Sequence, residues 1–294
     1  MICNLCPRKC SAERTDEQNI KGICKMPLLP RVARATLHFW EEPCISGTNG
    51  SGTVFFSGCP LKCVFCQNFS LSKDGFGEIV SVERLAEIFW ELEQKGANNI
   101  NLVTPTHYVH SIIKALEIYK PNIPIVYNSG GYDSVEALKA LENYIDVYLL
   151  DLKYMSSERA KRYSLAYDYP FVAKNAILEA YRQKSTPVIE NGIMKSGVIV
   201  RHLILPQGTN DAINVFNWVK DNLPNAYFSI MSQYIPCGNL EKYPEINRKI
   251  TRREYEKVLN HICRTDFNNC YFQELSSSSK DYIPDFDLTG IKKI

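Results

Sequence analysis

Three closely spaced cysteines have the types and spacing to hold a reactive metal centre. Cys59, Cys63 and Cys66 follow the pattern C-x3-C-x2-C. Three thiolates on one loop can bind three irons of a 4Fe–4S cluster and leave the fourth iron without a protein ligand. An open position of this kind is where a catalytic metal takes its substrate. We therefore predict a catalytic 4Fe–4S cluster, with a zinc loop built from the same thiols as the structural alternative.

A second set of cysteines lies at the N-terminus. Cys3, Cys6, Cys10 and Cys24 follow the pattern C-x2-C-x3-C-x13-C in a polar segment without helical or strand periodicity. Four thiolates suit a closed structural zinc site and equally an accessory 4Fe–4S cluster; four unligated thiols are the third reading. Because residues 1–30 bury too little apolar surface to fold alone, a bound metal would order them. We predict a metal-binding cap over residues 1–30.

The rest of the composition narrows the class of protein. Of 11 cysteines, four are scattered, and most of these are interpreted as core or surface thiols: Cys44, Cys237, Cys263 and Cys270. A disulfide scaffold is disfavoured because the chain is large and the other thiols form two tight clusters, which in a reducing compartment indicate metal. No apolar run reaches the roughly 18–20 residues of a membrane span. The net charge of +2 gives no indication of the basic surface that nucleic-acid binding requires. We expect a cytoplasmic protein that binds neither membrane nor nucleic acid.

Apolar runs typical of strands alternate with amphipathic helical patterns across residues 31–294, which we assign to one domain with a C-terminal extension. The predicted strands are Thr53–Phe56, Ile100–Val103, Pro124–Tyr127, Val147–Asp151, Val198–Leu205 and Tyr227–Met231. The predicted helices are Val82–Gln94, Val109–Ile118, Ser134–Glu142, Tyr169–Arg182, Ala212–Asn222 and Arg252–Cys263, followed by a short strand near Tyr271–Leu275. Alternation of this kind indicates an α/β fold with a parallel sheet. Six such units predict a partial (β/α)6 barrel whose strands all end on one rim.

Charged residues on two of these strands are candidates for that rim. Asp151 and Lys153 alternate with Leu152, so they share one face of the fourth strand near its end. An internal ion pair is the structural alternative for both. Arg201 lies inside the fifth strand, where an unpaired charge is costly, so we expect it to meet a carboxylate of a cofactor or of the protein.

Polar residues at other strand ends complete the candidate rim. Thr104 and Asn128 end the second and third strands, although turn and cap roles explain them equally well. Gln233 and Tyr234 end the sixth strand, and the lone His107 is a weaker candidate. The acidic pairs Glu41-Glu42 and Asp285-Phe286-Asp287 are interpreted as solvated turns.

The cysteine loop resembles the signature of the radical S-adenosylmethionine (SAM) superfamily, including Phe65 just before the last cysteine. In that family the open iron binds the amino and carboxylate groups of SAM. One electron then cleaves the sulfonium to methionine and a 5′-deoxyadenosyl radical, which abstracts hydrogen from the substrate. The resemblance implies a radical SAM barrel, a 4Fe–4S cluster, SAM as cofactor, and an electron donor such as flavodoxin or ferredoxin.

Further motifs resemble the activating enzymes of glycyl-radical proteins, the pyruvate formate-lyase activase group. The resemblance covers roughly residues 50–235 and rests on the entry strand Gly52–Cys59, on Asp151-Leu152-Lys153 and on Val200–Pro206. Two departures separate the chain from that group: Thr104-Pro105-Thr106-His107 replaces a Gly-Gly-Glu motif, and Asn128-Ser129-Gly130-Gly131 replaces an Asp-Thr-Asn-Gly pattern. The chain therefore looks like a side branch of activase homologues.

The resemblance also implies roles for the rim residues and a class of substrate. By resemblance, Asp151 and Lys153 would contact SAM or a cation beside its carboxylate. From their strand-end positions, Thr104 and Asn128 would bind its methionine or ribose part and Gln233 its adenosine or the substrate. Arg201 would meet a carboxylate of the cofactor or of the protein. The implied substrate is a backbone glycine of a partner glycyl-radical enzyme. Another peptide or a small molecule is the alternative within the family. A non-catalytic iron–sulfur electron carrier is the alternative outside it, and it would need a fourth cluster ligand.

Overall fold

Six parallel strands form the centre of the fold, and they follow one another across the sheet in chain order. The computed structural model describes residues 2–16, 21–275 and 284–292. The six strands are β4 (Ser51–Phe56), β6 (Ile100–Val103), β7 (Ile125–Ser129), β8 (Val147–Asp151), β10 (Ile193–Leu203) and β11 (Tyr227–Met231). Within the described ranges the sheet is open, with β12 (Cys270–Phe272) at one edge and β5 (Glu78–Ile79) at the other. The predicted α/β class and partial barrel are confirmed.

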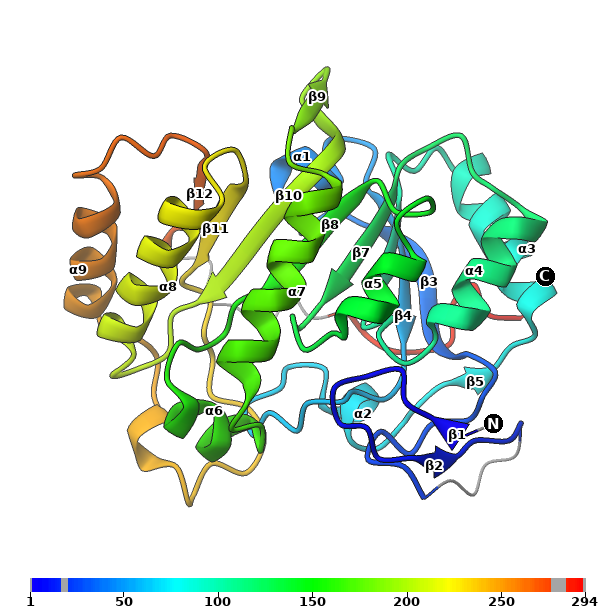
Figure 1. The fold of residues 1–294 in the computed structure, drawn as a ribbon, viewed down its shortest axis with the longest axis horizontal. Coiled ribbons are helices and arrows are strands. Elements are labelled where there is room, and N and C mark those ends of the chain that lie inside the picture. The colour runs from blue at the N-terminus through cyan, green and yellow to red at the C-terminus, as the bar shows by residue number, and fades with distance from the viewer. Residues whose placement is uncertain (1, 17–20, 276–283, 293–294) are drawn as a thin grey trace.

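Helices cover the outer face of this sheet (Figure 1). They are α3 (Val82–Gln94), α4 (Val109–Ile118), α5 (Val135–Ala140), α6 (Ser157–Ser164), α7 (Tyr169–Gln183), α8 (Thr209–Asn222) and α9 (Arg252–Ile262). Side-chain caps fix the starts of α3, α5 and α6. The hydroxyls of Ser81, Ser134 and Ser156 each accept a hydrogen bond from the backbone N–H three residues later. Apolar residues such as Leu85 and Phe89 of α3 are fully buried in the main core. The helices thereby hold the strand ends in register.

One long strand lies outside the predicted set. β3 (Arg31–His38) runs antiparallel to β4, so the sheet begins about twenty residues before the strand predicted at Thr53. A register shift between Val32 and Arg34 interrupts the two-residue alternation that identifies strands. In the C-terminal part, the backbone of Leu288 and Thr289 hydrogen-bonds β3. β10 begins at Ile193, five residues before its predicted start, and this added part pairs with the hairpin strand β9 (Val188–Glu190).

The cysteine-rich segment packs against the ends of the parallel strands. Its two short strands, β1 (Ile2–Cys3) and β2 (Ala12–Glu13), pair with each other, and in Figure 1 the segment lies beside α2 (Phe69–Ser72). Arg8 Nε donates to the carbonyl of Pro60 at 2.8 Å, which ties this segment to the cysteine loop. Its treatment as a separate unit ending at residue 30 remains a prediction. Among the helices described, none is long and apolar enough to cross a membrane.

Candidate active site

A cavity of about 260 Å³ opens where the parallel strands end, and the side chains predicted for the rim meet there. The nine predicted residues that line it are Cys59, Cys63, Cys66, Thr104, Asn128, Asp151, Lys153, Arg201 and Gln233. The common cavity follows from the topology, because parallel strands joined by helices place all their C-terminal ends on one side. The structure thus brings the three thiols and the charged strand residues into one site.

The cysteine loop turns directly out of β4. Gly58, the residue before Cys59, has φ +82°, a left-handed conformation that glycine adopts without strain. Backbone hydrogen bonds then hold the loop: the N–H of Val64 donates to the carbonyl of Tyr163 at 2.9 Å. Cys63 Sγ lies 3.0 Å from Ser164 Oγ. The last two residues of α6 therefore hold the middle of the cysteine loop.

The electrostatics of these thiols fit a cationic metal cluster. Burial raises the pKa of Cys59 and of Cys63, and the neighbouring thiols raise it further, whereas the Lys153 ammonium opposes the rise. Bound iron would supply the positive charge that such thiolates need. In the described part of the chain, no three His, Cys, Asp or Glu side chains are arranged to hold a single metal ion. The three thiols suit a four-iron cluster, since each thiolate can bind a different iron and leave the fourth iron open.

A charged network forms the floor of the cavity. Arg201 Nε donates to Asp151 Oδ1 at 2.9 Å, its Nη1 to Glu41 Oε2 at 3.0 Å and its Nη2 to Asn128 Oδ1 at 2.6 Å. Lys153 Nζ donates to the second oxygen of Asp151 at 2.5 Å. Burial alone would raise the pKa of Asp151, but the two cations outweigh burial and hold that pKa below its usual value. Asp151 is therefore a carboxylate with a cation on each oxygen.

Glu41 and Glu42 correct the interpretation of their segment as a solvated turn. Only 11% of the Glu41 side chain is exposed, and it lines the cavity. Glu42 is buried, and burial raises its pKa although Arg201 opposes the rise. The short helix α1 (Pro43–Ser46) starts at Pro43 and turns the chain so that these acids face inward. The available signal was Arg201, whose position inside a strand required a carboxylate partner.

Backbone geometry at two strand ends shapes the cavity wall. Thr104 directly follows β6 and has φ +62°, which is rare for a β-branched residue, and its N–H donates to the carbonyl of Asn128. After β7, a side chain on Gly131 would come within 2.1 Å of the Asp151 carbonyl oxygen, so only glycine fits there. Both departures from the activase motifs thus lie on the wall of this cavity.

Two weaker candidates lie outside the cavity lining. His107 is buried behind the cysteine loop, where its Nε2 lies 2.7 Å from the carbonyl oxygen of Ser57. Tyr234 is also buried, and its hydroxyl donates to the carbonyl of Ile246. Both side chains support the loops around the site. By contrast, Asp287 is exposed and accepts hydrogen bonds from Thr289, as expected for a turn.

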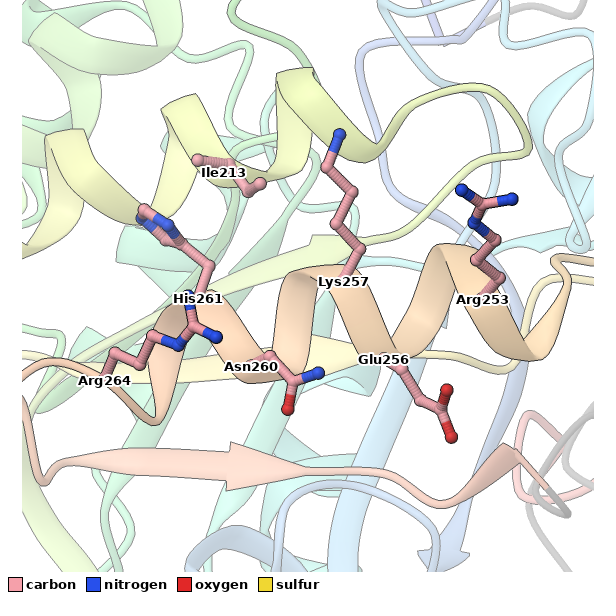
Figure 2. A pocket seen from close by; sticks show the side chains of 7 residues that line it. All are labelled: Ile213, Arg253, Glu256, Lys257, Asn260, His261 and Arg264. Carbon is pink, nitrogen blue, oxygen red and sulfur yellow. The ribbon is translucent and has the colours of Figure 1, made fainter.

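A second hollow, about 500 Å³, lies on the surface between α8 and α9 (Figure 2). Two of its basic side chains already have polar partners: Lys257 Nζ donates to Asn210 Oδ1 at 3.0 Å, and His261 Nε2 lies 2.8 Å from Asn217 Oδ1. Its lining contains no cysteine and no residue of a strand. The cavity at the strand ends is therefore the candidate site.

Sequence comparison identifies relatives across most of the chain. The profile of the Radical SAM superfamily matches residues 53–195. Uncharacterized protein MJ0674 of Methanocaldococcus jannaschii is 31% identical over 268 residues, which cover 87% of this chain and 73% of that protein. Uncharacterized protein MJ0808 of the same organism is 24% identical over 265 residues, covering 82% of this chain and 73% of that protein.

Solved structures of Streptococcus suis SuiB share the fold. The structure bound to S-adenosylmethionine has a TM-score of 0.53 and 17% identity, covering 74% of this chain and 48% of SuiB. The structure bound to the precursor peptide SuiA has a TM-score of 0.54 and 16% identity, covering 74% of this chain and 47% of SuiB. The chain therefore matches about half the length of SuiB. At this identity the likeness concerns the fold alone.

Proposed function

Since the chain belongs to the radical SAM superfamily, we propose that it cleaves SAM reductively in the cavity at the strand ends and acts on a peptide or protein substrate. The observation that carries this proposal is the meeting of three loop thiols with Asp151, Lys153 and Arg201 in one cavity. The family indicates the class of enzyme, and the cavity indicates where SAM would bind and which residues would contact it.

The thiols of Cys59, Cys63 and Cys66 would hold a 4Fe–4S cluster with one iron open to SAM. When bound, the cluster and SAM supply the hard chemistry: one electron cleaves the sulfonium, and the 5′-deoxyadenosyl radical takes a hydrogen atom from the substrate. The electron comes from a donor protein such as flavodoxin or ferredoxin. The chain's own residues would bind and orient SAM and the substrate, and they would exclude water.

The rim residues divide into binding and positioning groups. The Lys153 ammonium, which interacts electrostatically with the thiol of Cys63, would pair with the SAM carboxylate. Thr104 and Asn128 offer polar groups to the methionine or ribose part, and Gln233 to the adenosine or the substrate. Arg201 is a positioning residue, because its guanidinium already holds Asp151, Glu41 and Asn128 together.

Apolar side chains in the cavity lining would keep water from the radical. They are Phe55, Leu61, Phe65, Val103, Leu203 and Met231. Such a lining matters because a reactive intermediate is lost if water or solvent-borne donors reach it first.

The substrate assignment rests on two supports. The activase motifs favour a backbone glycine of a glycyl-radical enzyme. SuiB, whose fold this chain shares, has been solved with a precursor peptide, and this favours a peptide substrate more generally. Both supports favour a polypeptide as the substrate that enters the cavity. A small-molecule substrate is the competing possibility.

The experiment is SAM cleavage by anaerobically reconstituted protein reduced with dithionite. We expect 5′-deoxyadenosine and methionine from the wild type. Cys59→Ala, Cys63→Ala and Cys66→Ala should each abolish both products, while Cys263→Ala, which changes an exposed thiol, should retain them. Full cleavage by any one of the three variants would refute the ligand assignment. No cleavage by iron-loaded wild type would favour the electron carrier.

A further inference from the structure

A buried carboxylate links two segments that form the cavity wall. Asp133 is 1% exposed, and hydroxyls from both segments donate to it. Thr106 Oγ1, in the loop after β6, donates to Asp133 Oδ1 at 2.6 Å. Ser129 Oγ, at the end of β7, donates to Asp133 Oδ2. Thr106 and Ser129 belong to the two segments in which the chain departs from the activase motifs, so Asp133 joins both departures.

The two linked segments face the cavity, whereas Asp133 stands behind them. Four of their residues line the cavity: Thr104, Asn128, Ser129 and Gly130. The backbone also joins the segments, because the N–H of Thr104 donates to the carbonyl of Asn128 at 2.8 Å. The cavity lining includes neither Asp133 nor Thr106. Asp133 therefore acts on the wall from its protein side, without touching what the cavity holds.

The wall continues from this link to Lys153. Ser129 Oγ accepts a hydrogen bond from the N–H of Gly131 at 3.1 Å, which holds the turn after β7. The buried hydroxyl of Tyr169 lies 2.8 Å from the carbonyl oxygens of Gly130 and Asp151. The same hydroxyl accepts from the N–H of Lys153 at 2.9 Å. A shift of the turn after β7 would therefore pass to the backbone that carries Lys153.

A third hydroxyl reaches Asp133 from a different direction. Tyr127 donates to Asp133 Oδ1 at 2.7 Å, so the buried carboxylate has the hydrogen bonds that its burial requires. Tyr127 precedes Asn128 on β7, and successive side chains on a strand point to opposite faces of the sheet. Since Asn128 faces the cavity, Tyr127 lies on the other face and is not part of the lining.

We propose that Asp133 is a positioning residue for SAM, which holds Thr106 and Ser129 so that the wall presents its polar groups to the cofactor. The inference rests on the proposed function, in which SAM binds in this cavity. A carboxylate with a purely structural role would make the loss of any one donor equivalent. A positioning role makes the donor from the wall matter for SAM, and the donor from inside β7 matter for stability alone.

Two matched variants of the full, anaerobically reconstituted chain test this difference. Thr106→Val and Tyr127→Phe each remove one hydroxyl that donates to Asp133 Oδ1, and both should lower Tm. In isothermal titration with SAM, Thr106→Val should raise Kd by about fivefold, the equivalent of one hydrogen bond. Tyr127→Phe should leave Kd near the wild-type value. Without SAM, the electron paramagnetic resonance (EPR) spectrum of the reduced cluster should be the same in all three proteins.

Substitution of the carboxylate itself gives a graded result. Asp133→Ala should raise Kd more than Thr106→Val does, and Asp133→Asn should fall between wild type and Asp133→Ala because its amide oxygen still accepts on one side. If Asp133→Ala does not fold, the two matched variants decide alone. A Kd that is unchanged in Thr106→Val, or raised equally in Tyr127→Phe, would overturn the inference and leave the proposed function standing. No SAM binding by iron-loaded wild type would refute both together.

Discussion

Arg201 Nη1 lies 3.0 Å from Glu41 Oε2, a contact that joins residues 160 positions apart in the chain. Both side chains are largely buried, with 14% and 11% exposed. Glu41 Oε1 in turn accepts from the side-chain amides of Asn101 and Asn128. The pair therefore ties the segment before α1 to three parallel strands directly beneath the cavity.

Removing Arg201 should destabilise the fold strongly. Arg201→Ala leaves the carboxylate of Glu41 buried without its cation, and breaking one side of a buried ion pair costs about 3–5 kcal/mol. Urea unfolding of the reconstituted protein measures this loss. Arg252→Ala, which removes an exposed pair with Glu256, should cost under about 1 kcal/mol. Similar losses for both variants would show that the network carries little stability.

Lys153→Ala should weaken SAM binding more than it lowers stability. Asp151 keeps its contact with Arg201 when Lys153 is removed, so no buried charge loses its last partner. A charge-assisted hydrogen bond contributes about 1.5–3 kcal/mol, which corresponds to a Kd at least about tenfold higher. Isothermal titration with SAM measures the change, with Lys120→Ala as an exposed control. Unchanged affinity together with a lower Tm would make Lys153 a structural ion-pair partner.

The left-handed backbone at Thr104 predicts a difference between two substitutions that both remove the hydroxyl. Thr104→Ala keeps a side chain at φ +62°, whereas Thr104→Gly relieves that strain. The left-handed conformation costs an L-residue roughly 1–2 kcal/mol, and part of this gain is offset by the larger unfolded-state entropy of glycine. We expect the glycine variant to be more stable than the alanine variant by about 1 kcal/mol in urea unfolding. Equal stabilities would mean that no strain is stored there.

His107 predicts a pH dependence of stability. Burial, with help from Arg14, lowers the pKa of His107 to about 3, although the Ser57 carbonyl opposes the change. As pH falls below the ordinary pKa of about 6.5, the unfolded chain binds a proton that the folded chain refuses, so stability decreases. His107 should therefore lower the free energy of unfolding by about 1.4 kcal/mol as the pH falls from 8 to 5.5.

The variant His107→Gln isolates this contribution. Its unfolding free energy should fall less than that of the wild type over the same pH range, by about the amount assigned to His107. His110→Gln, which changes an exposed residue, should leave the wild-type slope intact. A slope that is the same in all three proteins would contradict a neutral, buried His107.

The sequence predicted the site residues that depend on local pattern. Asp151 and Lys153 were placed on one face because they are two residues apart on a strand, and their side chains meet at 2.5 Å. Arg201 was expected to meet a carboxylate because a charge inside a strand needs one. The partner Glu41 was missed, since the segment Glu41-Glu42-Pro43 looks like a solvated turn; only the tertiary fold brings it inward.

Two of the elements that escaped prediction, β3 and α6, did so for different local reasons. β3 (Arg31–His38) contains a register shift that breaks the alternation of apolar and polar residues. α6 (Ser157–Ser164) is short and mostly polar, so it presents no apolar stripe, yet its last residue contacts Cys63. In both cases long-range packing, which a local pattern does not contain, determines the element.

The most direct test of the cofactor site is the EPR spectrum of the reduced protein titrated with SAM. To remove any signal from an accessory cluster in residues 1–30, the variant Cys6→Ala/Cys24→Ala serves alongside the wild type. SAM that coordinates the open iron held by Cys59, Cys63 and Cys66 should change the g values of the reduced cluster and saturate at one equivalent per chain, with weaker saturation in Lys153→Ala. A cluster signal that stays unchanged at saturating SAM in both proteins would contradict an open iron in this cavity.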